Sequence, residues 1–413
     1  MGIRELNRKL QDFLRPKRLT LGRFLWDRKD SSFLWCFQRI SKFSIINTKF
    51  RNVDLNIKKP KCELGVRIEG LKNQKSETKN LIEKENIRSI LFIRNDGKIG
   101  DMIINTLMFR EIKKAYPQIK IGVVTRGANR QVVVNNPHVD KIYDYTKSDR
   151  ELKSLAKEIA FEKYDLLIDF SEMLRVKQMK FINLCRARVN MGLNKADWNL
   201  FDVSVEPNID FKWTEHVTLR YRAYLDKLGI IKPNLDYDLN LSEEDKKFAE
   251  KEFEKIKENK VTVLNPYGAS KHKTLSKSKL KEIIKYLTDK KNAVIFVYSP
   301  DKYSELESLV KELDNNRVYL PIGIKTINHT ASLIEKADFL ITPDTSIVHI
   351  GTAYKKNGIC IYPPNGGRYG VDHLVWGPID DNFKMIFCED KKSENDEIDV
   401  NTFKMEELDI EKN

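Results

Sequence analysis

Between positions 89 and 106 the chain reads Ser89-Ile-Leu-Phe-Ile-Arg-Asn-Asp-Gly-Lys-Ile-Gly-Asp101-Met-Ile-Ile-Asn-Thr106. The opening apolar run predicts a buried strand, the glycines predict a loop, and the residues after Asp101 predict the start of an amphipathic helix. Parallel sheets bind ligands at the carboxyl ends of their strands, and the N-terminus of a helix favours negative charge. This stretch therefore places one carboxylate where α/β proteins carry out ligand chemistry.

A second stretch repeats this order near the other end of the chain, where the sequence reads Ala337-Asp-Phe-Leu-Ile-Thr-Pro-Asp344-Thr-Ser-Ile-Val-His349. Around both stretches, strand patterns rich in Val, Ile and Leu alternate with helical patterns, which is typical of parallel sheets covered on both faces. We therefore expect an α/β enzyme with two doubly wound units that face each other across a cleft.

The expected strands fall into two sets of five. The first set covers Ile90–Arg94, Ile119–Thr125, Lys141–Tyr145, Leu166–Asp169 and Arg188–Gly192. The second set covers Val261–Leu264, Ala293–Tyr298, Val318–Tyr319, Phe339–Thr342 and Gly358–Ile361.

The length of 413 residues leaves room for two domains and extensions. We expect four regions along the chain. They are an N-terminal extension with its linker over residues 1–87, the first unit over 88–232, the second unit over 241–390, and an acidic tail with a short helix over 391–413.

The net charge of +14 is concentrated at the N-terminal end. Residues 1–60 hold 15 Lys and Arg against 5 Asp and Glu, together with many aromatic side chains and helical apolar spacing. A basic, aromatic helical segment is typical of contact with an anionic surface, either membrane headgroups or nucleic acid. A solvated helical extension that packs on the main body accounts for the same pattern equally well.

Several classes of protein are disfavoured by the sequence. No apolar run reaches about 18 residues, the N-terminus lacks the apolar region of a secretory signal, and the five cysteines are scattered. These features favour a cytoplasmic protein with reduced thiols. The chain has no HExxH, Walker A or GxGxxG motif, and the acidic pair Asp236 and Asp238 lies in the linker, where we expect a turn. We expect no metal and no other cofactor.

Three loops carry residues suited to catalysis. Asp101 is either a general base for an acceptor hydroxyl or an N-cap of the following helix, since both roles need a carboxylate at this place. The segment from Thr342 to His349 could cradle a pyrophosphate through backbone N–H groups and hydroxyls, with Asp344 holding a hydroxyl or capping the helix. The segment from Asn265 to Lys273 could neutralise a departing phosphate, or it could be a basic surface loop.

Together these loops resemble glycosyltransferase family 9, the bacterial heptosyltransferases of lipopolysaccharide core assembly. The matching motifs are Gly100-Asp101 after a strand, Asn265-Pro-Tyr-Gly-Ala-Ser270 followed by Lys273, and Asp344-Thr-Ser-Ile-Val-His349 after Ala-Asp and a strand. The resemblance runs from about residue 88 to residue 410. Two departures are Ser346 in place of the family's glycine and Tyr267 inserted before Gly268.

The resemblance implies a GT-B fold, with two Rossmann-like domains, an acceptor domain followed by a nucleotide-sugar domain. It also implies transfer of a sugar, typically heptose from ADP-heptose, with inversion and without a required metal. Asp101 would be the base, Lys273 would bind the donor phosphates, and Asp344 would hold hydroxyls of the donor sugar. The remaining donor-binding positions would be Gly268, Ala269, Ser270, Thr345, Ser346 and His349.

The acceptor implied by the resemblance is a lipid-linked, anionic glycan. Cations in first-unit segments could contact it, namely Arg126, Arg130, Arg175 and Lys177. The basic residues 1–60 would then hold the enzyme at an anionic membrane, at the inner face of the cytoplasmic membrane, rather than bind nucleic acid. Two other functions remain open: a nucleotide-sugar epimerase or hydrolase of the same fold, and a non-catalytic anion-binding protein.

Overall fold

The computed structural model describes residues 80–172, 176–196, 198, 200–268, 270, 273–364, 371–379, 381–389 and 400–408. The expected basic helical extension over residues 1–79 lies outside these residues. Most of the expected acidic tail also lies outside them. Within the tail, the expected short helix is observed as a single 3-10 turn, η6 (Met405–Glu407).

Two six-stranded sheets form the framework, and every recorded pairing between their strands is parallel. The N-terminal sheet has the order β3-β2-β1-β4-β5-β6, and the C-terminal sheet has the order β12-β11-β10-β7-β8-β9. The N-terminal strands are β1 (Ser89–Ile93), β2 (Lys120–Thr125), β3 (Lys141–Asp144), β4 (Leu166–Asp169), β5 (Val189–Leu193) and β6 (Val203–Val205). The C-terminal strands are β7 (Val261–Leu264), β8 (Ala293–Phe296), β9 (Val318–Tyr319), β10 (Phe339–Pro343), β11 (Asn357–Tyr362) and β12 (Phe383–Phe387).

Both sheets have the same doubly wound topology, because each order places the first and fourth strands of its unit side by side and winds outward from them. This confirms the predicted α/β class with two Rossmann-like units. In such sheets the strand order reverses between the two central strands, because the connections wind outward in opposite directions, and ligands bind in the crevice at the carboxyl ends of these strands. The crevices lie after β1 and β4 in one unit and after β7 and β10 in the other.

The prediction of five strands in each unit is wrong by one strand in each. The sixth strands, β6 and β12, lie at the outer edges of their sheets. Strand β6 is only three residues long, and β12 has the irregular burial expected of an edge strand, with Lys384 and Met385 exposed. Neither segment has the continuous apolar run that marks the buried central strands.

The helices largely begin at polar caps. Side chains of Ser148, Ser242, Ser276 and Thr326 each accept a hydrogen bond from a backbone N–H in the first turn of the helix that follows. The helices around the N-terminal sheet are α4 (Leu81–Lys84), α5 (Ile99–Ala115), α6 (Arg130–Val133), α7 (Asp149–Glu162), α8 (Val176–Cys185) and α9 (Val217–Leu228). Those around the C-terminal sheet are α10 (Glu243–Phe253), α11 (Lys277–Asp289), α12 (Tyr303–Leu313), α13 (Ile327–Lys336), α14 (Ser346–Ala353) and α15 (Asp372–Trp376).

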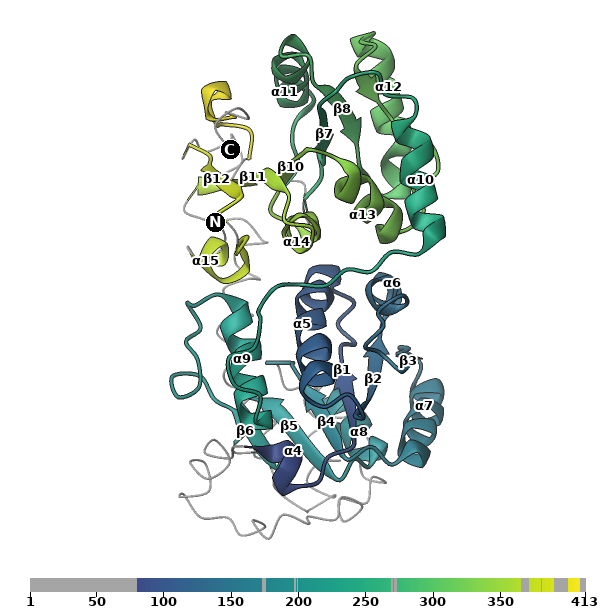
Figure 1. The fold of residues 1–413 in the computed structure, drawn as a ribbon, viewed down its shortest axis with the longest axis vertical. Helices are drawn as coiled ribbons and strands as arrows, with labels where there is room; N and C mark the ends of the chain where they lie inside the picture. The colour runs from purple at the N-terminus through teal and green to yellow at the C-terminus, as the bar shows by residue number, and fades with distance from the viewer. Residues whose placement is uncertain are drawn as a thin grey trace, which may run out of the picture.

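The two units meet through a few helices (Figure 1). The N-terminal unit lies below and the C-terminal unit above, with α5 and α6 facing α14 and α13, respectively. The extended segment between α9 and α10, residues 229–242, crosses from the N-terminal unit to the C-terminal unit and is here called the connecting segment. The N-terminal ends of α5 and α14 therefore come together at the boundary of the two units.

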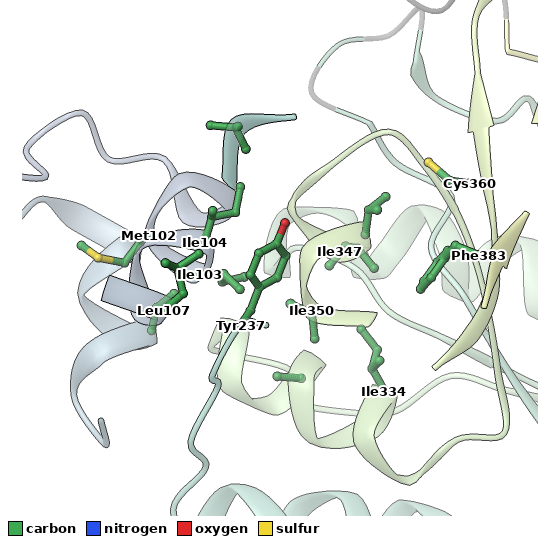
Figure 2. Close-up of a cluster of buried hydrophobic side chains, with 14 of the residues drawn as sticks. Met102, Ile103, Ile104, Leu107, Tyr237, Ile334, Ile347, Ile350, Cys360 and Phe383 are labelled. Carbon is green, nitrogen blue, oxygen red and sulfur yellow. The ribbon is translucent and has the colours of Figure 1, made fainter. Parts of the chain in front are cut away.

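An apolar seam continues across this boundary (Figure 2). Ile103 and Ile104 on α5 face Ile347 and Ile350 on α14, and Tyr237 of the connecting segment lies between them. All five side chains are buried. Removal of this apolar surface from water stabilises the contact between the units.

Arg110 of α5 binds the connecting segment. Its guanidinium donates hydrogen bonds to the backbone oxygens of Asn234 and Asp236, at 2.7 and 2.8 Å, and to the Asp238 carboxylate at 2.9 Å. Residues 233–242 are extended, so the turn expected at the acidic pair is not formed. Asp238 instead serves as a counter-charge for Arg110.

No helix in the described part of the chain combines the length and the apolar character that crossing a bilayer demands.

We expect Arg110→Gln to lower the free energy of unfolding by about 2 kcal/mol, because it removes several hydrogen bonds from a charged group to partly buried acceptors. Urea unfolding followed by tryptophan fluorescence measures this change. The matched control is Lys114→Gln on the exposed side of the same helix, expected to stay within about 0.5 kcal/mol of the parent. Equal stability of both variants would contradict the fastening role of Arg110.

Candidate active site

The two predicted loops meet where Gly100 lies against His349. A Cβ built on Gly100 would lie 2.6 Å from Cδ2 of His349 and 3.5 Å from Cα of Ser346. Any side chain at position 100 would therefore push α5 away from α14. The glycine of the first motif permits direct contact with the helix of the second motif.

Asp101 lies in the first turn of α5 but does not cap it. The N-cap position belongs to Lys98, and no side chain caps this helix. The Asp101 carboxylate instead accepts a hydrogen bond from Nη2 of Arg94 at 3.1 Å and lies 3.5 Å from Nζ of Lys98. The capping interpretation is therefore wrong, and the carboxylate is held by two cations beside a cavity.

Arg94 is a buried anchor for this carboxylate. Its guanidinium also donates to the Asp96 carboxylate at 3.1 Å and to the hydroxyl of Tyr221. Burial disfavours the charged form of Arg94, but Tyr221, Asp101 and Asp96 outweigh burial and raise the pKa of Arg94 above its ordinary value. Arg94 therefore keeps its charge and fixes the orientation of Asp101.

In the C-terminal unit, the loop after β7 folds back tightly on itself. A Cβ built on Gly268 would lie 2.2 Å from the backbone oxygen of Lys273. Asn265 donates through Nδ2 to the oxygen of Tyr267 and to the hydroxyl of Thr342, each at 2.9 Å. These contacts tie the loop after β7 to the end of β10, so both predicted donor segments form one rim.

Lys273 and Asp344 are joined across this rim, with Nζ 2.5 Å from Oδ2. Asp344 does not cap α14, because Thr345 takes that position and accepts a hydrogen bond from the Ile347 N–H at 3.1 Å. Ser346 begins the helix outside the left-handed region, so this backbone does not require the family's glycine. Lys273 has two further N–H bonds to offer.

His349 lies one turn into α14 and is buried between the units. Burial lowers the pKa of His349 to about 4, against the opposing effect of the Asp344 and Asp101 carboxylates. The imidazole is therefore neutral near pH 7. Its Nδ1 is buried without a hydrogen-bond partner among the described residues, and its ring packs against Tyr237 at a centroid distance of 6.0 Å.

A cavity of about 420 Å³, here called the interunit cavity, opens beside the N-terminus of α14. Three predicted donor residues line it: Gly268, Thr345 and Ser346. The sequence-based reasoning did not identify its other polar lining residues. These include Ser299 after β8, Thr326 at the start of α13 and Gln131 of α6, whose Oε1 accepts from the Ile327 N–H at 2.7 Å.

A second cavity of about 400 Å³, here called the Asp101 cavity, is lined by Asp101. Two predicted acceptor residues, Arg126 and Lys177, line it. Arg130 does not, since it is largely exposed and forms an ion pair with Asp144 at 3.1 Å. Arg175, like Ala269 of the donor set, lies outside the described residues, and Ser270 is exposed on its loop.

The sequence-based prediction missed most residues of the Asp101 cavity, and four of these contribute to its charge or its aromatic wall. They are Arg94, Asp169, Arg220 and Trp376. Asp169 ends β4 and is buried, and burial raises the pKa of its carboxyl. Its position after a central strand could have been recognised from the topology rule. Arg220 sits on a helix with no local motif. Trp376 begins the run Trp376-Gly377-Pro378, which resembles the family's sequence, but only the folded chain brings Trp376 to Arg220.

The arrangement combines a fixed carboxylate, a cation-lined cavity on one side and a helix N-terminus with a lysine on the other. A helix N-terminus and a lysine suit phosphate oxygens. A carboxylate held at the edge of a cavity can accept a proton from a hydroxyl bound there. Such a site supports group transfer between two ligands.

Comparison with known proteins identifies the family. The family model described as "Glycosyltransferase family 9 (heptosyltransferase)" matches residues 152–402. Among curated relatives, "Putative lipopolysaccharide heptosyltransferase 4" of Escherichia coli is 25% identical over 306 residues, covering 71% of this chain and 79% of the relative. The "Lipopolysaccharide core heptosyltransferase OpsX" of Haemophilus influenzae is 23% identical, with coverage of 64% and 76%.

Solved structures show the same fold. E. coli ADP-heptose lps heptosyltransferase II superposes with a TM-score of 0.60 at 17% identity, covering 72% of this chain and 90% of that one. A glycosyl transferase family 9 protein from Veillonella parvula gives 0.61 at 18% identity, covering 74% and 88%. The two facing Rossmann-like units are the GT-B fold. The chain belongs to glycosyltransferase family 9 and is a glycosyltransferase.

Proposed function

We propose that this glycosyltransferase moves a heptose from ADP-heptose, with inversion, to a lipid-linked anionic glycan of the lipopolysaccharide core. The observation that carries the proposal is that Asp101 lines the Asp101 cavity and directly follows Gly100, which lies against His349 and Ser346 of α14. The donor assignment is supported by related structures, namely E. coli ADP-heptose lps heptosyltransferase II and E. coli heptosyltransferase WaaC with ADP-2-deoxy-2-fluoro heptose.

The interunit cavity is assigned to the nucleotide. Its walls include Tyr267, Tyr298 and Ile324, which give an apolar surface for a base and ribose. The diphosphate is placed at the N-terminus of α14, where backbone N–H groups and the hydroxyls of Thr345 and Ser346 can bind it. Lys273 lies on the same rim and neutralises the phosphate charge, while its partner Asp344 holds hydroxyls of the sugar.

The Asp101 cavity is assigned to the acceptor. The Asp101 carboxylate removes the proton of the acceptor hydroxyl as its oxygen bonds to the anomeric carbon. The bond between that carbon and the diphosphate oxygen breaks, and the electron pair leaves with the nucleoside diphosphate. Lys273 and the α14 N-terminus stabilise the growing negative charge. Attack from the face opposite the leaving group inverts the anomeric centre.

We expect Asp101→Asn to lower acceptor-dependent release of nucleoside diphosphate by about 10²- to 10⁴-fold, the usual contribution of a general base. The assay presents ADP-, UDP- and GDP-sugars with and without deacylated core oligosaccharide. Asp96→Asn is the matched control, because Asp96 also pairs with Arg94 but is not assigned a proton-transfer role. Release that ignores the acceptor, or full activity in Asp101→Asn, would instead favour an epimerase or hydrolase.

His349 should make stability depend on pH. Its pKa is about 4 in the folded protein and about 6.5 when unfolded, so only the unfolded chain gains its proton between these values. Stability from this group is complete above pH 6.5 and falls as the pH drops towards 4, by roughly 3 kcal/mol at most. We expect His349→Asn to flatten this part of the urea-midpoint profile, with pH 8 as the reference; an unchanged slope would contradict the buried neutral imidazole.

Residues 1–60 are proposed to hold the enzyme at the anionic membrane surface where the acceptor lies. Their excess of Lys and Arg supports this, since each basic residue near such a surface contributes about 1 kcal/mol. We expect deletion of residues 1–60 to weaken sedimentation with vesicles containing anionic lipid and to leave the circular dichroism of the fold intact. Equal vesicle binding by the truncated protein would favour an extension packed on the body.

A further inference from the structure

Arg220 on α9 is a largely buried cation surrounded by aromatic rings. Its guanidinium carbon lies 4.6 Å from the ring centre of Trp213, 5.2 Å from that of Phe211 and 5.9 Å from that of Trp376. Trp376 comes from α15 of the C-terminal unit, whereas the other two rings come from the segment just before α9. These rings fix the plane of the guanidinium beside the Asp101 cavity, which Arg220 lines.

Arg220 has no carboxylate partner in the part of the chain that the structure describes. Among the described residues it forms no ion pair and donates no hydrogen bond, and its Nε is buried without a partner. Glu172 and Asp101 of the same cavity act on it only at longer range, and burial lowers the pKa of Arg220 below its ordinary value. A buried charge without a counter-charge is costly, and an acid group of a ligand removes that cost.

Two other arginines of the N-terminal unit, Arg94 and Arg110, do not share this state. Arg94 donates hydrogen bonds to Asp96, Asp101 and Tyr221, and Arg110 donates hydrogen bonds to the connecting segment. The hydrogen bonds of both guanidiniums are thus made to groups of the protein itself. Arg220 alone among the three has its donors available to a ligand in the Asp101 cavity.

The C-terminal unit helps to hold Arg220 and its aromatic neighbours in place. Nε2 of His216, the N-cap residue of α9, lies 3.0 Å from the backbone oxygen of Gly377, next to Trp376. Nζ of Lys98, which also contacts Asp101, lies 5.7 Å from the ring centre of Trp376. Trp376 therefore touches both the arginine and a lysine that binds the Asp101 carboxylate.

We infer that Arg220 is the receptor for an acid group, a carboxylate or a phosphate, on the acceptor sugar whose hydroxyl faces Asp101. The inference rests on the proposed function and adds the group by which the acceptor is selected and positioned. A guanidinium presents a planar pair of N–H donors that matches the two oxygens of either acid. Bound in this way, the acid fixes the sugar in the cavity and sets which of its hydroxyls reaches the base.

Arg220→Gln tests the inference with three acceptors: deacylated core oligosaccharide, its carboxyl-reduced form and its dephosphorylated form. We expect the variant to lose about 10- to 100-fold in kcat/KM for the untreated acceptor, with the donor KM within twofold of the parent. The parent should lose kcat/KM to the same extent with one of the two treated acceptors. The treatment that causes this loss identifies the acid as a carboxylate or a phosphate. The variant should show no further loss with that acceptor. The matched control is Arg222→Gln, since Arg222 lies on the same helix but is exposed and paired with Asp226 at 3.8 Å.

Equal losses with all three acceptors would assign Arg220 a structural role and overturn the inference, as would parental activity in the variant. Binding is measured separately, through quenching of tryptophan fluorescence by the untreated oligosaccharide, because Trp213 and Trp376 flank the guanidinium. The parent could bind the oligosaccharide through its acid group, lose this binding in Arg220→Gln, and yet transfer no sugar. That result would support Arg220 as the receptor and contradict the proposed function. Absence of both binding and transfer in the parent would overturn both.

Discussion

The close contact between Gly100 and His349 is the constraint on which the site depends. It brings the N-termini of α5 and α14 together, so two helix ends with partial positive charge converge at the boundary of the units. Asp101 and Asp344 lie at these ends, and each is paired with a cation of its own unit. The fold thus places one ion pair of each unit close to the boundary. These ion pairs lie where we propose that the donor phosphates and the acceptor hydroxyl bind.

The apolar seam beneath this contact explains how the charged loops keep their positions. Ile103 and Ile347 bury their side chains across the boundary, and Tyr237 fills the space between them. Because Arg110 also fastens the connecting segment to α5, the segment between the units is itself part of the interface. Burial of apolar surface and charged hydrogen bonds therefore act at the same place, next to the loops to which we assign catalysis.

The sequence predicted the central strands and the facing loops, because these are encoded locally by apolar runs, glycines and polar helix starts. The same local patterns identified Asp101, Lys273, Asp344 and His349 as one set. The edge strand β12 was missed because its exposed positions break the pattern of a buried strand. Arg220 was missed for another reason: its environment is assembled from Trp213 and from Trp376, and no local pattern links helices so far apart in sequence.

Trp376 makes the Asp101 cavity depend on the C-terminal unit. It belongs to the C-terminal unit, which supplies the rim assigned to the donor, yet its ring lies against Lys98 and Arg220 of the Asp101 cavity. A movement of the C-terminal unit would withdraw this ring and the Gly377 oxygen that pairs with His216. The contacts of Trp376 with Lys98 and Arg220 therefore depend on the observed arrangement of the two units. Closure that also encloses the donor would align both ligands before proton transfer and would keep water from competing as the acceptor.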